Sequence, residues 1–537
     1  MTRTRPPARH RLLCTLLAAA VAWPALATPA VAQVRLPALG EAASDDLNIG
    51  TERRVGEQIM REGRRDPAYL DDPVLVEYIQ SLWAPLVDGA RKLGNIDSEI
   101  DQAFAWQTFL LRDRSVNAFA LPGGYVGVHL GLIALTSTSD QLASVLAHEL
   151  THVTQRHIAR SIAPQQHASM MALAGMLLGI FAASRGGSAD VANAAMMGGQ
   201  GAAIQTQLNF SRDMEREADR IGYSVLATAG YSTGGMAAMF EKLDVATRLN
   251  DNSGFPYLRS HPLTVDRISE ARNRTLLDTT PARPPTVLHA VMQARSRVLM
   301  DDSAQGLHRL NGASSSPVLG DRVGALYAGA MAASLLKEHE RAETQAAEAL
   351  RLAATATPRE ASAERAITLL QVQVRLARGD APAALAALDG LGAAATERAP
   401  MLLRAQAGLE LHQRQAQASA APLRASTEAL QTWLADHPQD AGAWDLLART
   451  SGALGLRLRA MRADAEARAA VGDLTGAMDR LRAAQQVSRT ATGQDFIEGS
   501  VIDARLRQIT ATRRQLALEL RGDSSRRVPG PDEPLPQ

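Results

Sequence analysis

The sequence predicts a mostly α-helical protein with a small β-sheet near its N-terminal end and a helical array in its C-terminal half. Apolar residues recur at helical spacing from Asn48 to Gly94. Two apolar segments, Ala103–Leu111 and Tyr125–Ile133, lie on either side of the turn sequence 121–124 and predict strands. The second half is rich in alanine and has helical periodicity throughout. These observations predict a mixed N-terminal domain followed by an all-helical one.

Composition excludes several classes of protein. The 537 residues correspond to roughly three domain-sized units at about 150 residues each. A hydrophobic content of 46% is typical of a globular chain and excludes a wholly disordered one. With 57 basic against 56 acidic residues, the net charge is +1, so the chain lacks the basic excess of nucleic-acid-binding proteins. We therefore expect no nucleic-acid partner.

The first 32 residues have the pattern of a secretory signal peptide. Basic residues precede the apolar run Leu12–Val21, and the small residues Ala30-Val31-Ala32 predict cleavage before Gln33. An uncleaved anchor helix is the alternative, but the run is short for a membrane span. Cleavage would remove Cys14, the single cysteine, so no disulfide is expected in the mature chain. In a bacterium this signal predicts a periplasmic protein.

The remaining chain divides by composition. A helix is expected from Ser139 or Asp140 to about Ile158, and another starts near Phe210. The expected divisions are a metal-containing domain at 33–275 with an apolar, glycine-rich hairpin at 168–205, a linker at 276–310, helical repeats at 311–520 and a disordered tail at 521–537.

The apolar segment 168–184 permits three interpretations. At about 17 residues it is at the lower limit for a spanning helix. It could equally be a helix packed on the domain core, or a hydrophobic cover that touches a membrane or unfolded proteins peripherally. Its glycines favour the latter two over a transmembrane span.

The chemistry is concentrated in the sequence His148-Glu149-Leu150-Thr151-His152. Residues four apart lie on one helix face, so both imidazoles can bind one metal ion. Glu149 lies about 100° round the helix, where a base can act on water beside the metal. Two imidazoles and a carboxylate suit zinc. The alternative, a plain amphipathic helix, would crowd costly polar groups onto one turn.

A second acidic helix offers a third ligand. Glu215 and Asp219 are also four residues apart, so Glu215 could complete the zinc site while Asp219 accepts a hydrogen bond from a ligating histidine. Glu217 would point away from this face, and we assign it to a solvated surface.

Three motifs in order carry a family resemblance. The run 117–124 (NAFALPGG), then HELTHVTQRH at 148–157, then SRDMEREAD at 211–219 resemble the membrane-associated zinc metallopeptidases related to HtpX and the CAAX prenyl endopeptidases. The resemblance covers roughly residues 45–275. The signal peptide and the repeats make the chain most similar to periplasmic members of this family that act in outer-membrane β-barrel assembly.

This resemblance implies a gluzincin-like site with one Zn²⁺ per chain. His148, His152 and Glu215 would be ligands, and Glu149 and Asp219 would be the catalytic base and its supporting carboxylate. It also implies that the strand near 125–130 lines the cleft and pairs with an extended peptide.

Three further residues follow from the family pattern. His261, in the element His261-Pro262, would be a latent fourth ligand that keeps the enzyme inactive until substrate displaces it. Arg267 would anchor the same loop or bind a substrate carbonyl. His157, five residues after His152, faces elsewhere on a continuous helix and is interpreted as structural.

The C-terminal half has degenerate tetratricopeptide (TPR-like) features that predict an α-solenoid. The clearest is His437-Pro438 followed by Trp444 and Leu447, and Gly472-Asp473-Leu474 supplies an interhelix turn. A plain alanine-rich helical bundle is the alternative. Such an array is expected to offer a surface for protein partners. The resemblance implies that these partners are the β-barrel assembly machinery and unfolded outer-membrane clients.

Together these observations predict a periplasmic zinc metalloendopeptidase that cleaves misfolded or misassembled envelope proteins. The alternative is a repeat-bearing chaperone or assembly factor whose zinc site is structural or largely silent. Glu149 favours the peptidase, because a purely structural site has no need of a base.

Overall fold

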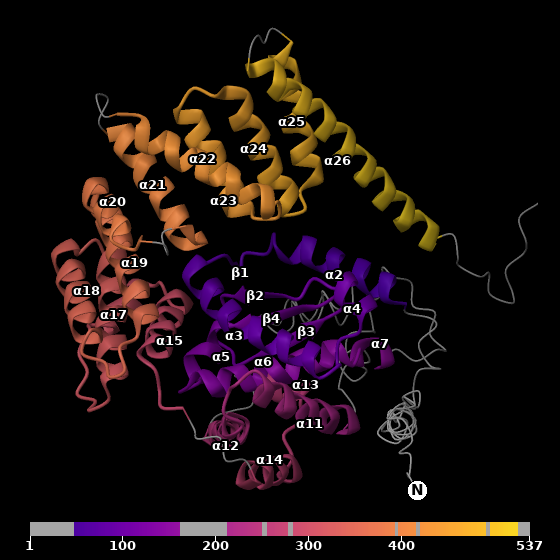
Figure 1. Ribbon diagram of the computed structural model, residues 1–537, viewed down its shortest axis with the longest axis vertical. Helices are drawn as coiled ribbons and strands as arrows, with labels where there is room; N and C mark the ends of the chain where they lie inside the picture. Colours follow the sequence, from indigo (N-terminus) through magenta and orange to yellow (C-terminus); the bar gives the residue numbers. More distant parts are fainter. Residues whose placement is uncertain are drawn as a thin grey trace, which may run out of the picture. The chain divides into compact units, whose positions relative to one another are not determined.

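A computed structural model describes residues 48–161, 212–249, 255–277, 283–392, 396–414, 419–489 and 494–524. All of them belong to one compact unit that starts at Asp46 (Figure 1). The predicted signal peptide (1–32), the apolar hairpin (168–205) and residues 525–537 of the predicted tail lie outside the described residues.

The N-terminal region is helical with one small sheet, as predicted. Its elements are α2 (Ile49–Gly63), β1 (Tyr69–Leu70), α3 (Pro73–Lys92), α4 (Ser98–Ala103), β2 (Gln107–Leu111), β3 (Ala118–Leu121), β4 (Tyr125–His129), α5 (Leu130–Leu135), α6 (Ser139–Thr154), α7 (His157–Ser161), α11 (Arg212–Thr228), α12 (Gly234–Leu249), α13 (Tyr257–Ser260) and α14 (Val265–Leu277).

The sheet has the strand order β1-β2-β4-β3. Strand β4 pairs with β2 in parallel and with β3 in antiparallel orientation, so it lies inside the sheet and β3 is at an edge. The expectation that residues 125–130 form the substrate-pairing edge was wrong. The turn at Gly123 and Gly124, which have φ values of 77° and 87°, folds β3 back onto β4. In addition, Leu130 begins helix α5 instead of extending the strand.

Helix α6 is buried along almost its whole length, and its N-cap is Thr138 rather than the expected Ser139 or Asp140. The predicted continuation to Ile158 was wrong. Arg156 has a positive φ of 51°, which ends the helix and starts α7 in a new direction.

Helices that are close in sequence form the C-terminal array: α15 and α16 both pack against α17, and from α17 to α26 each helix packs against the next. They are α15 (Val287–Met300), α16 (Ala304–Arg309), α17 (Leu319–Leu335), α18 (His339–Ala353), α19 (Ala361–Arg378), α20 (Ala381–Asp389), α21 (Arg398–Arg414), α22 (Ala421–Asp436), α23 (Ala441–Ala453), α24 (Arg457–Ala470), α25 (Leu474–Ser488) and α26 (Gln494–Ser524). This arrangement is the predicted α-solenoid.

Two predicted boundaries differ from the structure. The range 276–310, expected to be a linker, contains α15 and α16, because Val287, Val291 and Val298 form a buried apolar face. Helix α26 continues to Ser524, past the expected start of the tail at residue 521.

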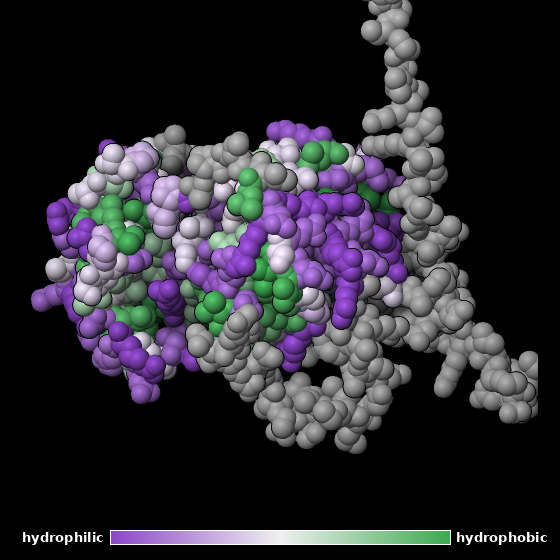
Figure 2. Space-filling view, turned by 90° about the horizontal axis from the view of Figure 1, so that it is seen from below, coloured by the Kyte–Doolittle hydropathy of each residue, from purple (hydrophilic) through white to green (hydrophobic). Residues whose placement is uncertain are grey.

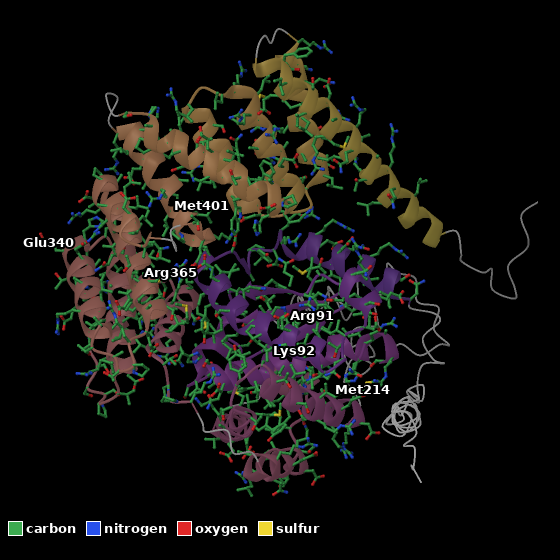
Figure 3. The ribbon with its side chains drawn as sticks, in the orientation of Figure 1. Arg91, Lys92, Met214, Glu340, Arg365 and Met401 are labelled. Carbon is green, nitrogen blue, oxygen red and sulfur yellow. The ribbon has the colours of Figure 1, made fainter. Side chains whose placement is uncertain are left out.

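One buried and one partly buried ion pair join α3 to the array. Arg295 on α15 forms a bidentate pair with Asp72, the N-cap of α3, with nitrogen–oxygen distances of 2.7 Å. Arg365 on α19, labelled in Figure 3, contacts Glu77 of α3 at 3.0 Å. A continuous hydrophobic core extends from α3 to α21. The array therefore packs directly against the region that carries the candidate site.

The surface carries both hydrophilic regions and apolar patches, as the face in Figure 2 shows. Exposed large apolar side chains include Val245 of α12 and Val265 and Leu276 of α14. Within the described ranges, no helix has both the length and the apolar composition needed to cross a bilayer.

Candidate metal centre and active site

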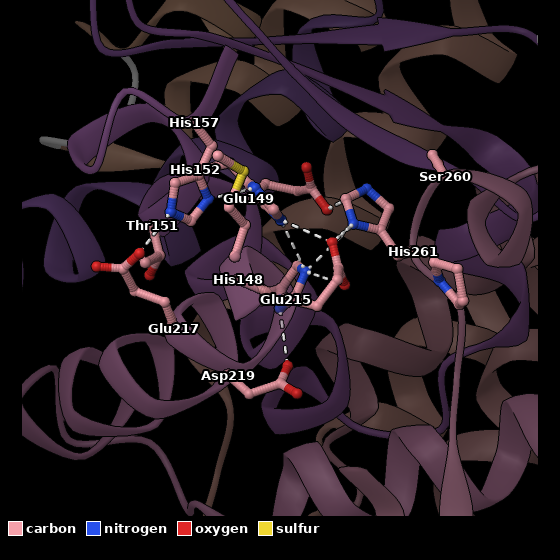
Figure 4. Close-up of polar contacts among 12 residues, drawn as sticks. His148, Glu149, Thr151, His152, His157, Glu215, Glu217, Asp219, Ser260 and His261 are labelled. Atoms are coloured by element: carbon pink, nitrogen blue, oxygen red, sulfur yellow. Dashed lines mark hydrogen bonds and ion pairs between the residues drawn. The ribbon is translucent and has the colours of Figure 1, made fainter. Parts of the chain in front are cut away.

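Helices α6 and α11 build the site together. Helix α6 carries His148, Glu149 and His152 on neighbouring turns, and all three side chains are buried. Helix α11 approaches closely at Gly222, where an added Cβ would lie only 3.2 Å from the carbonyl oxygen of Ala147. This close packing brings Glu215, at the start of α11, beside the two histidines (Figure 4).

Four side chains converge on one point. One ligand atom from each of His148, His152, Glu215 and His261 lies within 4.8 Å of the others. The Nε2 atoms of His148 and His152 are 3.0 Å apart, and Glu215 oxygens lie 3.5 Å from each of these nitrogens. The structure therefore brings together every residue that the sequence nominated as a ligand, including the residue predicted as a latent fourth one.

This cluster fits a divalent metal ion. The Nδ1 atom of His148 faces Asp219, and Nδ1 of His152 faces His157, so both Nε2 lone pairs are available inside the cluster. Such lone pairs and a carboxylate repel one another when buried without a cation between them. Imidazole nitrogens with one carboxylate are a donor set that zinc prefers.

Glu149 is fully buried beside this cluster. Neither of its carboxylate oxygens has a hydrogen-bond partner among the described residues, although His261 Nε2 lies 3.6 Å from Oε1. Burial raises the pKa of Glu149. Burial also acts on Glu215, but the neighbouring His261 and His148 outweigh it and hold the pKa of Glu215 well below its usual range. The two carboxyls therefore differ, with Glu215 suited to be an ionised ligand and Glu149 to exchange protons.

Asp219 is held between a histidine and an arginine. Its Oδ1 lies 3.0 Å from His148 Nδ1. Arg267 donates from Nε to Asp219 Oδ2 at 2.6 Å and from a terminal nitrogen to Oδ1 at 2.8 Å. A carboxylate can only accept, so His148 donates Nδ1–H to it and keeps Nε2 free for the cluster. Asp219 therefore occupies the supporting position predicted for it.

His261 follows the short helix α13 and is buried. Its Nδ1 lies 2.9 Å from Glu215 Oε1 and 3.3 Å from His148 Nε2. Arg267 also donates to the carbonyl oxygen of Pro262 at 2.9 Å and pairs with Glu215 at 2.8 Å. Of the two predicted roles for Arg267, its position fits the anchoring of this loop.

Two residues interpreted as structural or solvated belong to the site. His157 Nδ1 lies 2.8 Å from His152 Nδ1, and His157 Nε2 lies 3.1 Å from Glu217 Oε2. Arg160 donates to the same Glu217 oxygen at 3.0 Å. The sequence interpretation failed because it assumed one continuous helix, whereas the break at Arg156 turns His157 back toward His152.

Comparison with known proteins agrees with this geometry. Residues 91–275 match the model of Peptidase family M48, so the chain contains an M48 metallopeptidase domain. A putative beta-barrel assembly-enhancing protease of Vibrio cholerae is 41% identical over 266 residues, which are 48% of this chain and 51% of that protein. The Escherichia coli beta-barrel assembly-enhancing protease is 34% identical over 50% of this chain and 52% of its own length. The chain thus spans about half the length of these two curated relatives.

One relative matches over most of the chain at lower identity, and another matches over a shorter part. The beta-barrel assembly-enhancing protease of Yersinia pestis is 28% identical over 89% of this chain and 92% of its own length. A mitochondrial metalloendopeptidase OMA1 of Schizosaccharomyces pombe is 32% identical over 30% of this chain and 44% of that protein. The similarity that the OMA1 protein shares is limited to less than a third of this chain.

Proposed function

We propose that the chain, whose residues 91–275 form an M48 metallopeptidase domain, is a zinc-dependent endopeptidase of the bacterial periplasm. Its substrates are misfolded or misassembled envelope and outer-membrane proteins. One observation carries the proposal: the Glu149 carboxylate, which receives no side-chain hydrogen bond within the part of the chain that the structure describes, is buried beside a convergent set of two histidines and Glu215. A structural metal site has no use for such a base.

Each residue of the site has a role that follows from its position. His148, His152 and Glu215 would hold the zinc ion, with Asp219 orienting His148. Zinc bound there supplies a Lewis acid that polarises a peptide carbonyl and makes water more acidic. Glu149 accepts the proton of the attacking water and delivers it to the leaving nitrogen.

The edge strand β3 is the proposed binding site for an extended peptide substrate. The backbone of Ala120 in β3 lies close enough to Glu149 to lower the pKa of that carboxyl, although burial dominates and raises it. Within the described sheet β3 pairs only with β4, and we propose that an extended peptide pairs with its other edge. Main-chain hydrogen bonds along this edge would bind unfolded segments with little dependence on sequence.

The proposed location and partners are supported by features outside the metal cluster. The predicted signal peptide supports export to the periplasm. The names of three relatives, beta-barrel assembly-enhancing proteases, support outer-membrane proteins as clients. The helical array would dock the β-barrel assembly machinery or the clients themselves.

Metal removal tests the proposed function directly. We expect the purified mature chain to contain close to one zinc per molecule, and chelation to abolish cleavage of an unfolded protein such as casein. Re-addition of Zn²⁺ should restore the cleavage. Absence of zinc, or cleavage that continues after complete chelation, would refute the peptidase assignment.

His261→Ala is expected to raise the peptidase activity of the zinc-loaded protein several-fold. Removing this imidazole takes one donor out of the cluster and leaves a position open to substrate, which a catalytic zinc site needs. Initial rates of casein cleavage measure the effect. His308→Ala, which removes an exposed histidine on α16, is the matched control. Equal or lower activity in the His261 variant would show that His261 does not restrain the enzyme.

A further inference from the structure

A second histidine lies directly behind the ligand candidate His152. The His157 ring is fully buried and contacts the Nδ1 side of His152, opposite the side that faces the cluster (Figure 4). On its other side His157 contacts Glu217, which comes from α11. Three residues from three helices therefore form a chain that ends at the metal cluster.

The chemistry of these groups fixes the direction of each hydrogen bond. An ionised carboxylate only accepts, so Glu217 receives the Nε2–H of His157. A neutral imidazole has one N–H, so His157 Nδ1 is then an acceptor. The 2.8 Å contact between the two Nδ1 atoms requires a proton, and His152 must supply it. His152 therefore keeps its Nε2 lone pair for the cluster.

We propose that His157 and Glu217 are positioning residues for His152, which set its tautomer and ring orientation for metal binding. A ligating histidine usually donates its remote N–H directly to a carboxylate or carbonyl. His148 follows that rule through Asp219. On its Nδ1 side, His152 is linked to the Glu217 carboxylate through a second imidazole, that of His157. This inference rests on the proposed metal site.

The surrounding structure supports a fixed orientation of His157. The positive φ of Arg156 turns α7 so that its first residue meets His152. Arg160, one turn further along α7, binds the same Glu217 oxygen at 3.0 Å and keeps the carboxylate in place. Helix α11 thus contributes Glu215 to the cluster, and Asp219 and Glu217 to the support of the two histidines.

Zinc affinity of the otherwise intact full-length mature chain tests this inference. We expect His157→Ala to weaken Zn²⁺ binding by about 10- to 100-fold in a competition titration against a chromogenic chelator. His157→Gln should recover most of this affinity, because its amide oxygen can accept from His152 while its amide nitrogen donates to Glu217. Glu217→Gln should lower the affinity by a smaller factor.

Cobalt substitution gives a readout that general destabilisation does not mimic. Replacing Zn²⁺ by Co²⁺ should show altered visible absorption bands in His157→Ala and near-normal bands in His157→Gln. Asp213→Asn is the control, since Asp213 lies on the same helix α11 and its side chain is 91% exposed. If His157→Ala fails to fold, His157→Gln and Glu217→Gln decide the question.

The measurements distinguish the absence of a zinc site from the absence of a positioning role for His157. If the unaltered chain binds no Zn²⁺, the proposed function fails. If it binds Zn²⁺ and His157→Ala binds it equally well with unchanged cobalt bands, the positioning role is refuted. An equal loss in the alanine and glutamine variants would also refute it, as would a Glu217→Gln variant that is indistinguishable from Asp213→Asn.

Discussion

Glu149→Gln is expected to lower the rate of peptide cleavage by about 10²- to 10⁴-fold while the bound zinc is retained. The amide has nearly the shape of the carboxyl and fits the same buried position, but it cannot take up a proton. No described side chain donates a hydrogen bond to Glu149, and the glutamine amide keeps one oxygen that can still accept from the nearby Ala120 backbone, so little of the surrounding structure should change. Casein cleavage and the zinc content of the same sample measure the two quantities.

The control for Glu149→Gln is Glu62→Gln, an exposed glutamate on α2. Its activity and zinc content should match those of the unaltered chain. If Glu149→Gln retained activity within a few-fold, Glu149 would not be the base. If the variant kept zinc and also kept the ability to rescue outer-membrane assembly, the chaperone alternative would be favoured.

Arg295→Leu is expected to destabilise the protein by about 3–5 kcal/mol. Arg295 is 2% exposed and forms two bonds with Asp72, one with the Tyr327 hydroxyl and one with Gln373. Removal of the guanidinium leaves the Asp72 carboxylate buried and uncompensated, and this residue also caps α3. The shift in the urea unfolding midpoint, converted with the measured slope, gives the loss.

The matched control for Arg295 is Arg351→Leu. Arg351 pairs with Glu348 at the surface, where the two side chains are 67% and 42% exposed. Exposed pairs contribute about 0–1 kcal/mol, so this variant should unfold close to the unaltered chain. Equal midpoints for the two variants would mean that the Arg295 ion pair does not hold α15 against α3.

Much of the candidate site could be predicted because helical spacing is a local rule. His148 and His152 are four residues apart, as are Glu215 and Asp219, and each pair does lie on one helix face. The meeting of the two pairs follows from the need for a third ligand and from the family resemblance, since no local pattern encodes the contact between α6 and α11.

The failures have physical causes that local patterns do not contain. His157 was misplaced because a single backbone angle at Arg156 redirects the chain. The free sheet edge was misassigned because the four residues of β3 are too few for a clear alternating pattern. The linker expected at 276–310 is wrong for α15, because its valines are periodic and buried although proline-rich sequence precedes them.

Arg267 links the loop that carries His261 to the carboxylates of the metal cluster, because it contacts both. Its guanidinium contacts Asp219, Glu215 and the carbonyl of Pro262, the residue after His261. Movement of His261 away from the cluster would also move Pro262, and with it the Arg267 guanidinium that pairs with Glu215. If His261 restrains the enzyme as proposed, its release would also loosen Glu215, and a form with His261 displaced should exchange its metal ion faster than a form with His261 in the cluster.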